Sequence, residues 1–373
     1  MIYLDCAATS LQKPRAVGEA SMRAMRTMAS PGRGGHRPAM LAADAALDCR
    51  INIAGLFNVP EPEQVVFTLN ATHALNIAIN SLARTGESVV ISGYEHNSVT
   101  RPLHARGLEI QVADTELFDT EAALERFERE LRGASLCVTT MVSNVFGYIL
   151  PIEGIAALCR EHGVPLIIDA SQAAGCMDID FTALGAEFIA MPGHKGLLGP
   201  QGTGVLLCRN GGVPLMQGGT GSASSLPLMP DFMPDMLEAG THNITGIAGL
   251  DAGVSFVRRT TPEKIGAHER RLMRDMAKRL GDVPGIRVYL AERGEVQSGV
   301  LSIVPERGGA ELLAEELGKR DVAIRAGLHC APSAHMTAGT IETGTARFSF
   351  SPFNTPDEVH RAVNTVAGIV KNM

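Results

Sequence analysis

The sequence predicts an α/β fold: a mostly parallel seven-stranded sheet with flanking helices, followed by a smaller α+β C-terminal domain. Between residues 64 and 208, seven short runs rich in apolar and β-branched residues recur, as strands do. Several are separated by stretches with the periodicity of amphipathic helices. The runs are apolar along nearly their whole length, which is typical of parallel strands that are covered on both faces.

Strands and helices alternate in the first two thirds of the chain. The predicted strands are 64–68, 88–92, 109–113, 135–141, 165–170, 187–191 and 204–208. The predicted helices between them are 71–84, 97–107, 119–131 and 151–162. The alternation favours βαβ units, in which successive strands run parallel, and the run at 109–113 resembles an edge strand.

The pattern changes after a stretch rich in Gly, Ser, Pro and Met at 211–237. Helices are predicted near 244–258, 262–280, 309–319 and 355–371, and strands near 284–290, 298–304, 321–326 and 345–350. We therefore divide the chain into a large domain of residues 1–255 and a small α+β domain of residues 256–373. We expect the N-terminal segment 1–15 to pack with the small domain.

The composition narrows the classes of function. The 373 residues suit one large or two moderate domains, and a hydrophobic content of 45% argues against wholesale disorder. The net charge of −7 and the lack of a basic run argue against a nucleic-acid partner. No signal peptide is recognised, and no apolar window approaches the ~20 residues of a membrane span. Seven scattered cysteines without a C-x-x-C pair are typical of reduced thiols, so we expect a cytoplasmic protein.

Polar residues follow nearly every predicted strand of the large domain. They are Thr72, His73, Glu95, His96, Asn144, Asp169, Gln172, His194 and Lys195. In an open α/β sheet, ligands bind beyond the carboxyl ends of the strands. The strand ends therefore predict one ligand site that contains a lysine, a carboxylate and several histidines.

Common nucleotide and metal motifs do not match this site. Lys195 lies in a Gly-rich loop, but the residues around it do not fit the P-loop pattern, and neither Gly202–Leu207 nor Gly219–Ser224 fits the dinucleotide-binding pattern. The segment HCAPSAH (329–335) has few ligands for zinc and no second ligand cluster. We therefore predict no metal.

Pyridoxal 5'-phosphate (PLP) fits the residues better. This cofactor needs a lysine that bonds its aldehyde, a carboxylate that faces its pyridine nitrogen and donors for its phosphate. Lys195 and Asp169 supply the first two, and the helix that begins near Thr72 offers backbone N–H groups to a phosphate. His96 is placed to lie over the ring.

Nine motifs, in order along almost the whole chain, resemble the class V aminotransferase family, which belongs to fold type I of the PLP enzymes. They are YLDCAATS, FTLNATHALN, YEHNS, SNVFG, IIDASQAAG, GHKGLLGPQGTG, LEAGTHN, RAGLHCAP and ARFSFSPFNT. Within that family the chain is similar to group II cysteine desulfurases and selenocysteine lyases. The resemblance implies that L-cysteine is converted to L-alanine and that the sulfur stays on an enzyme cysteine as a persulfide.

The resemblance also implies roles for individual residues. Lys195 would bond the cofactor and act in catalysis, and Cys330 would accept the sulfur. The other cofactor-binding residues would be Thr72, the backbone of His73, His96 (stacked on the ring and counted as catalytic), Asn144, Asp169, Gln172, His194, and Gly240 and Thr241 of a second subunit. Arg347 would bind the substrate carboxylate, and we add Arg325 and His36 as further candidates for substrate binding. Cys330 would react as a thiolate, a charge that His329 or Arg325 could stabilise.

The resemblance implies a homodimer with shared sites, and a sulfur-acceptor protein is a further candidate partner. Three positions depart from the family pattern: Pro192 replaces a serine, His73 a glutamate and Cys6 an asparagine or serine. The loop 325–330 is short, which favours an acceptor whose thiol reaches in. Two other functions stay open: another class V enzyme (aminotransferase, epimerase or lyase) that does not use Cys330, and a non-catalytic sulfur carrier or interaction protein.

Overall fold

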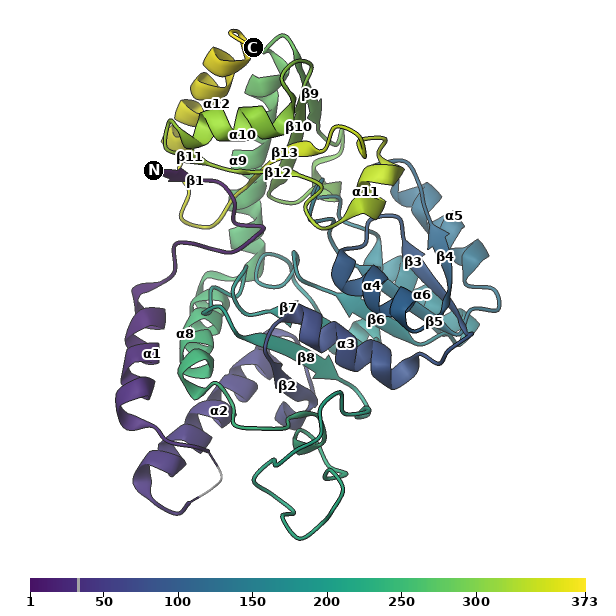
Figure 1. Ribbon diagram of the computed structural model, residues 1–373, viewed down its shortest axis with the longest axis vertical. Helices are drawn as coiled ribbons and strands as arrows, with labels where there is room; N and C mark the ends of the chain where they lie inside the picture. Colours follow the sequence, from purple (N-terminus) through teal and green to yellow (C-terminus); the bar gives the residue numbers. More distant parts are fainter. Residues whose placement is uncertain (32–33) are drawn as a thin grey trace.

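A seven-stranded sheet forms the centre of the larger part of the molecule, and the computed structural model describes residues 1–31 and 34–373 (Figure 1). Its strand order is β2-β8-β7-β6-β5-β3-β4. The strands are β2 (Val65–Thr68), β3 (Ser88–Ser92), β4 (Glu109–Ala113), β5 (Leu136–Thr140), β6 (Leu166–Asp169), β7 (Phe188–Pro192) and β8 (Gly204–Cys208). The pairs from β7 to β4 are parallel, and β8 runs antiparallel to both β7 and β2. The predicted mostly parallel sheet is confirmed, and β4 is an edge strand.

Helices cover both faces of the sheet, because alternate side chains of each strand point to opposite faces. Leu166 and Ile168 belong to one hydrophobic cluster and Ile167 to another, and all three are buried. The helices of this part are α1 (Arg15–Thr27), α2 (Arg37–Leu56), α3 (Ala71–Leu82), α4 (Asn97–Ala105), α5 (Thr120–Glu130), α6 (Ile152–His162), α7 (Phe181–Leu184) and α8 (Ile244–Thr260).

Helices α1 and α2 precede every helix that the sequence predicted. The buried face of α1 consists of Val17, Ala20 and Ala24, which give a weak apolar signal. Helix α2 carries apolar side chains on its exposed side as well, including Leu47 and Ile51, so no single apolar stripe stands out.

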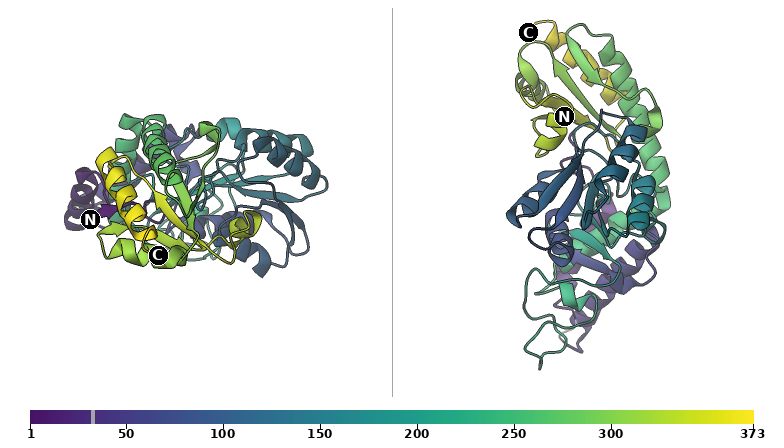
Figure 2. Two further views of the ribbon diagram at one scale, coloured as in Figure 1. Left: turned by 90° about the horizontal axis from the view of Figure 1, so that it is seen from above. Right: turned by 90° about the vertical axis from the view of Figure 1, so that its right-hand side faces the viewer.

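A four-stranded antiparallel sheet with the order β12-β13-β10-β9 forms the smaller part, which lies at one end of the long axis (Figure 2). Its strands are β9 (Ile286–Tyr289), β10 (Val300–Pro305), β12 (Arg325–Gly327) and β13 (Thr345–Ser349). Its helices are α9 (Pro262–Gly281), α10 (Gly309–Gly318), α11 (Pro332–Thr337) and α12 (Pro356–Val370). Near the N-terminus, β1 (Ile2–Tyr3) pairs with β11 (Val322–Ala323), and Ile2 and Leu4 join the core of this sheet. The division at residue 255, which falls inside α8, stays a prediction.

No helix of the described residues is both long enough and apolar enough to cross a membrane.

The loop that carries Lys195 contacts the segment after β6 through backbone alone. A Cβ atom built at Gly175 would lie 2.2 Å from the carbonyl oxygen of Gly196, and Gly175 has φ +91°. A Cβ atom built at Gly196 would lie 2.2 Å from the carbonyl oxygen of Ala174. Ser10 Oγ donates to the carbonyl oxygens of His194 (3.0 Å) and Lys195 (3.1 Å), so the loop is held from two sides.

We expect Gly175→Ala to lower the free energy of unfolding by about 2–4 kcal/mol, because the methyl group overlaps backbone and the φ angle is unfavourable. Urea unfolding followed by circular dichroism measures the change. The control is Gly18→Ala in α1, where a Cβ meets nothing within 4 Å and a gain of about 1 kcal/mol is expected. Equal midpoints for Gly175→Ala and the unmodified chain would contradict the close contact.

Candidate active site

A cavity with about 760 Å³ of empty space lies at the carboxyl ends of β3, β5, β6 and β7. The predicted residues that line it are Thr72, His96, Asn144, Asp169, Gln172, His194, Lys195, Arg325 and Arg347. The first seven come from segments that follow strands of the large sheet, and the two arginines come from β12 and β13 of the smaller sheet. The cavity therefore lies between the two sheets, where parallel strands end at the same edge.

Lys195 follows β7 and lines this cavity. Burial lowers the pKa of its amine to about 8; Asp169 raises the pKa, and Arg347 and Arg325 lower it. A lysine with this pKa is partly neutral near physiological pH. Such an amine can bond an aldehyde or accept a proton, which an ordinary lysine does poorly.

Asp169, the last residue of β6, is buried with 3% exposure. Its Oδ1 atom accepts a hydrogen bond from the Ser171 N–H at 2.9 Å. Within the described residues, Oδ2 has no such partner and is available to a ligand. The negative charge of Asp169 acts on both Lys195 and His96, because it raises the pKa of each.

His96 caps the N-terminus of α4. Its Nδ1 atom accepts from the Ser98 N–H at 3.0 Å. Burial lowers the pKa of the ring to about 4, against the opposing effect of Asp169, so the ring is neutral at physiological pH. Glu95, its neighbour, does not line the cavity: it is fully buried and accepts from the Thr140 N–H at 2.9 Å.

The N-terminus of α3 opens into the cavity through Asn70, Ala71 and Thr72. Asn70 caps the helix, and its side chain accepts from the His73 N–H at 2.9 Å. The N–H groups of Ala71 and Thr72 have no partner among the described residues, as is usual in the first turn of a helix. Two free N–H groups and the helix dipole suit a phosphate. Thr72 Oγ1 lies 2.8 Å from Ser98 Oγ, and His194 adds a ring whose pKa burial lowers to about 4.

Arg347 is the most deeply buried charged side chain of the site, with 1% exposure. Its Nη1 atom donates to the Asn144 carbonyl oxygen and its Nη2 atom to Asp5 Oδ1, both at 2.8 Å. Its Nε atom is buried without a partner among the described residues. The guanidinium is thus held in place and lines the cavity, where its positive charge suits a carboxylate.

Cys330 is exposed and lies in the turn between β12 and α11. It does not line the cavity, but its neighbour His329 does. Arg325 Nη2 lies 3.6 Å from the Cys330 Sγ atom. The Cys330 carbonyl oxygen accepts a hydrogen bond from the Asn97 N–H at 2.7 Å. Burial lowers the pKa of His329 to about 2, so His329 is neutral. Of the two groups predicted to stabilise a thiolate at Cys330, only Arg325 carries the charge.

Besides Cys330, four predicted residues lie outside the cavity of their own chain. The backbone N–H of His73 is occupied by Asn70, and its ring accepts from the Leu69 N–H at 3.2 Å, so His73 has no free backbone donor there. His36 is exposed and caps α2. Gly240 and Thr241 are also exposed and lie apart from the lining residues. The roles predicted for these four residues stay predictions.

Two residues of the site were given no role from the sequence. Asp5 pairs with Arg347 across 342 positions of the chain, and no local pattern marks such a pair. Ser98 contacts both Thr72 and His96, and the motif YEHNS that contains it was the only signal.

The donors of this cavity fit PLP. The cavity combines a lysine of lowered pKa, a carboxylate with a free oxygen, two unpaired N–H groups and a buried arginine. Within residues 1–31 and 34–373, no three His, Cys, Asp or Glu side chains gather as metal ligands.

Known proteins match the chain over its full length. Residues 2–362 match the family described as Aminotransferase class-V. A probable cysteine desulfurase of Methanothermobacter thermautotrophicus is 31% identical, with 99% of this chain and 94% of that protein covered. A cysteine desulfurase of Salmonella newport is 32% identical, with 97% and 92% covered. The apo structure of a cysteine desulfurase from Thermococcus onnurineus NA1 is 29% identical, with a TM-score of 0.92 over 100% of this chain and 95% of that one.

We expect Arg325→Gln to slow the alkylation of Cys330 by iodoacetamide at pH 7 by about threefold, because the cation beside the sulfur stabilises the reactive thiolate. Mass spectrometry of the Cys330 peptide measures the rate. Arg320→Gln is the matched control, because Arg320 is exposed and pairs with Glu316. An unchanged rate in Arg325→Gln would show that Arg325 does not act on this thiol.

Proposed function

The chain belongs to the class V aminotransferase family, and on that premise we propose that it is a PLP-dependent cysteine desulfurase. It converts L-cysteine to L-alanine and keeps the sulfur on Cys330 as a persulfide. The observation that carries this proposal is the exposed thiol of Cys330, beside Arg325, at the edge of a cavity that contains Lys195 and Asp169.

The residues that would hold the cofactor come from five segments, at the ends of β2, β3, β5, β6 and β7. Lys195 would bond it, Asp169 would face its ring nitrogen, and His96 would lie on its ring. Asn144 and Gln172 would contact the ring oxygen, while Thr72, the first turn of α3 and His194 would bind the phosphate. When bound, PLP supplies an electron sink for the charge left on the Cα atom of an amino acid.

The chain's own groups bind the substrate, move the proton and take the sulfur. Arg347, whose guanidinium lines the cavity, binds the substrate carboxylate. Lys195 Nζ, in its neutral form, accepts the proton from Cα and later returns a proton to Cα. The Cys330 thiol gives up its proton, and its Sγ atom attacks the sulfur of the substrate. The Cβ–sulfur bond breaks and the sulfur remains on Cys330, while Cβ keeps the electron pair of that bond and takes a proton to become the methyl group of alanine.

A homodimer with shared sites is part of the proposal. Exposed large apolar side chains occur on α1, α2 and the segment 211–237: Met22, Met25, Met40, Leu47, Ile51, Val213, Leu226, Leu228 and Phe232. So much exposed apolar surface supports a protein partner. The exposed Gly240 and Thr241 follow Glu238, which accepts from Arg50 Nη2 and the Phe67 N–H, both at 2.6 Å. We propose that this fixed loop completes the phosphate site of the second subunit.

The sulfur acceptor and the compartment are also proposed. Because Cys330 is exposed at a short turn, a small thiol or an acceptor protein whose cysteine reaches in suits the site. Seven free cysteines support a reducing, cytoplasmic location. Selenocysteine as a second substrate stays a prediction.

The test of the function is alanine formation from L-cysteine by the purified PLP-loaded protein with a reductant. We expect alanine and sulfide in equal amounts and a loss of about 100-fold or more in Cys330→Ala. Cys6→Ser should keep the activity, because burial raises the pKa of the Cys6 thiol to about 12. Full alanine formation by Cys330→Ala would favour the alternative, a class V enzyme that does not use this cysteine.

If the two subunits share their sites, a substitution outside the cavity of its own chain should weaken PLP binding in the other subunit. Thr241→Ala should raise the dissociation constant of PLP by about tenfold, because one phosphate donor of the second subunit is lost. Equilibrium dialysis against PLP measures it, and sedimentation should give twice the chain mass of 39.5 kDa. Thr365→Ala, whose hydroxyl donates only to the Arg361 carbonyl oxygen, is the control. A monomeric protein with intact PLP binding would exclude shared sites.

A further inference from the structure

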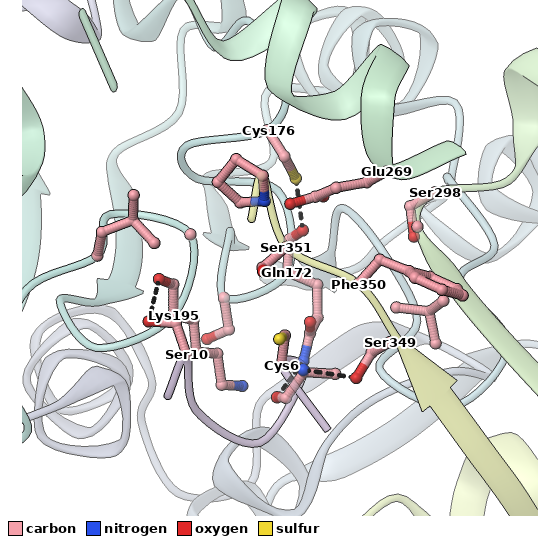
Figure 3. Close-up of a pocket in the computed structure, with 17 residues that line it drawn as sticks. Cys6, Ser10, Gln172, Cys176, Lys195, Glu269, Ser298, Ser349, Phe350 and Ser351 are labelled. Atoms are coloured by element: carbon pink, nitrogen blue, oxygen red, sulfur yellow. Dashed lines mark hydrogen bonds between the residues drawn. The ribbon is translucent and has the colours of Figure 1, made fainter. Parts of the chain in front are cut away.

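A second cavity, with about 480 Å³ of empty space, adjoins the active-site cavity (Figure 3). The two cavities share four lining residues: Ala7, Ser171, Gln172 and Lys195. The rest of its wall comes from the N-terminal segment, the loop 196–198, helix α9 and the ends of β10 and β13. Lys195 is therefore in contact with two separate spaces, and the proposed function uses only one of them.

Glu269 of α9 is the one carboxyl group that lines this second cavity. It is 8% exposed, and the described residues give it neither a hydrogen bond nor an ion pair. Figure 3 shows its side chain extending from the helix towards Cys176 and Ser351. A buried carboxyl without a partner is costly, so its presence in a cavity indicates a role or bound water.

Two further observations describe the surroundings of Glu269. Ser298 Oγ, also in the wall, is buried without a partner. A Cβ atom at Gly299 would lie 2.6 Å from Glu269 Cβ and 3.3 Å from Oε2, so a side chain there would crowd the carboxyl group. The wall thus combines apolar side chains such as Leu198 and Phe350 with the unpaired groups of Glu269 and Ser298, and ordered water is the usual partner of such unpaired groups.

The titratable groups near Glu269 are Cys6, Cys176 and Arg270, and Lys195 lines the same cavity. Burial raises the pKa of Cys6 to about 12 and that of Cys176 further, so both thiols stay protonated. Burial also raises the pKa of Glu269 to about 8, with Arg270 opposing the shift. Because the pKa of Lys195 is lowered to about 8, these two groups gain and lose protons over the same pH range.

We propose that Glu269 holds protons for Lys195 and exchanges them through water in the second cavity. A proton leaves the Lys195 ammonium, which becomes a neutral amine, and the Glu269 carboxylate takes it and becomes a neutral acid; the reverse transfer restores both. Only N–H and O–H bonds change. The inference rests on the proposed function, in which Lys195 is the base. Substrate occupies the first cavity during turnover, so the second offers Lys195 a separate path for its proton.

The experiment compares Glu269→Gln, Glu269→Asp and wild type as PLP-loaded enzymes between pH 6 and 9.5. We expect Glu269→Gln to lower kcat about tenfold, with KM changed less than twofold, and to remove the inflection of kcat near pH 8. Glu269→Asp should restore part of kcat. Glu263→Gln, on the exposed first turn of the same helix, is the control and should match wild type.

A second readout does not depend on turnover. Infrared spectra of the resting enzyme should contain a protonated-carboxyl band that disappears as pH rises through 8, and part of it should be absent from Glu269→Gln. The remainder belongs to Glu95, whose pKa burial also raises to about 8. Unchanged kcat, pH profile and infrared band in Glu269→Gln overturn the inference, as does a rise in KM in place of a fall in kcat. If the wild-type enzyme forms no alanine, the proposed function is wrong. The infrared band still tests the protonation of Glu269 in that case.

Discussion

The chemistry of this molecule depends on two opposing effects on the pKa of Lys195: burial lowers this pKa, and the negative charge of Asp169 raises it. Burial alone would favour a neutral amine, and the two arginines act in the same direction, while the carboxylate draws the proton back. The result is a lysine near the midpoint of its titration at physiological pH. This balance follows from topology: β6 and β7 are parallel neighbours with Asp169 opposite Ala190, so the segments after both strands meet at one edge of the sheet.

The smaller unit completes the site through a chain of direct contacts. Arg347 joins Asp5 of the N-terminal segment to the Asn144 carbonyl oxygen, and the Asn144 side chain donates to the His329 carbonyl oxygen at 2.8 Å. Three segments far apart in the sequence thus meet at one guanidinium. A motion of the smaller unit would change the position of Arg347 and of the turn that carries Cys330 together. In the proposed function, these contacts would link the position of the substrate carboxylate to that of the sulfur-accepting thiol.

The large sheet could be read from the sequence because its strands are buried on both faces and its helices are amphipathic. The same strand pattern predicted that Lys195, Asp169 and His96 lie at the carboxyl ends of strands. Helices with alanine-lined faces gave too little contrast, and α1 and α2 were missed. The contact of Asp5 with Arg347 depends on tertiary packing over most of the chain. Glu269 lies in a segment of charged residues, HERRLMRD, where nothing in the sequence distinguishes a buried carboxyl from exposed ones.

The turn at His329 and Cys330 separates the surroundings of two neighbouring side chains. Both residues adopt positive φ angles, +50° and +58°, which cost about 1–2 kcal/mol each for residues other than glycine. Hydrogen bonds from Asn144 to the first carbonyl and from Asn97 to the second hold the strained backbone. The turn directs the imidazole of His329 into the protein, where it lines the cavity, and leaves the next side chain exposed. The same turn keeps the Cys330 sulfur beside Arg325 and open to solvent, which is the placement that the proposed transfer of sulfur to an acceptor requires.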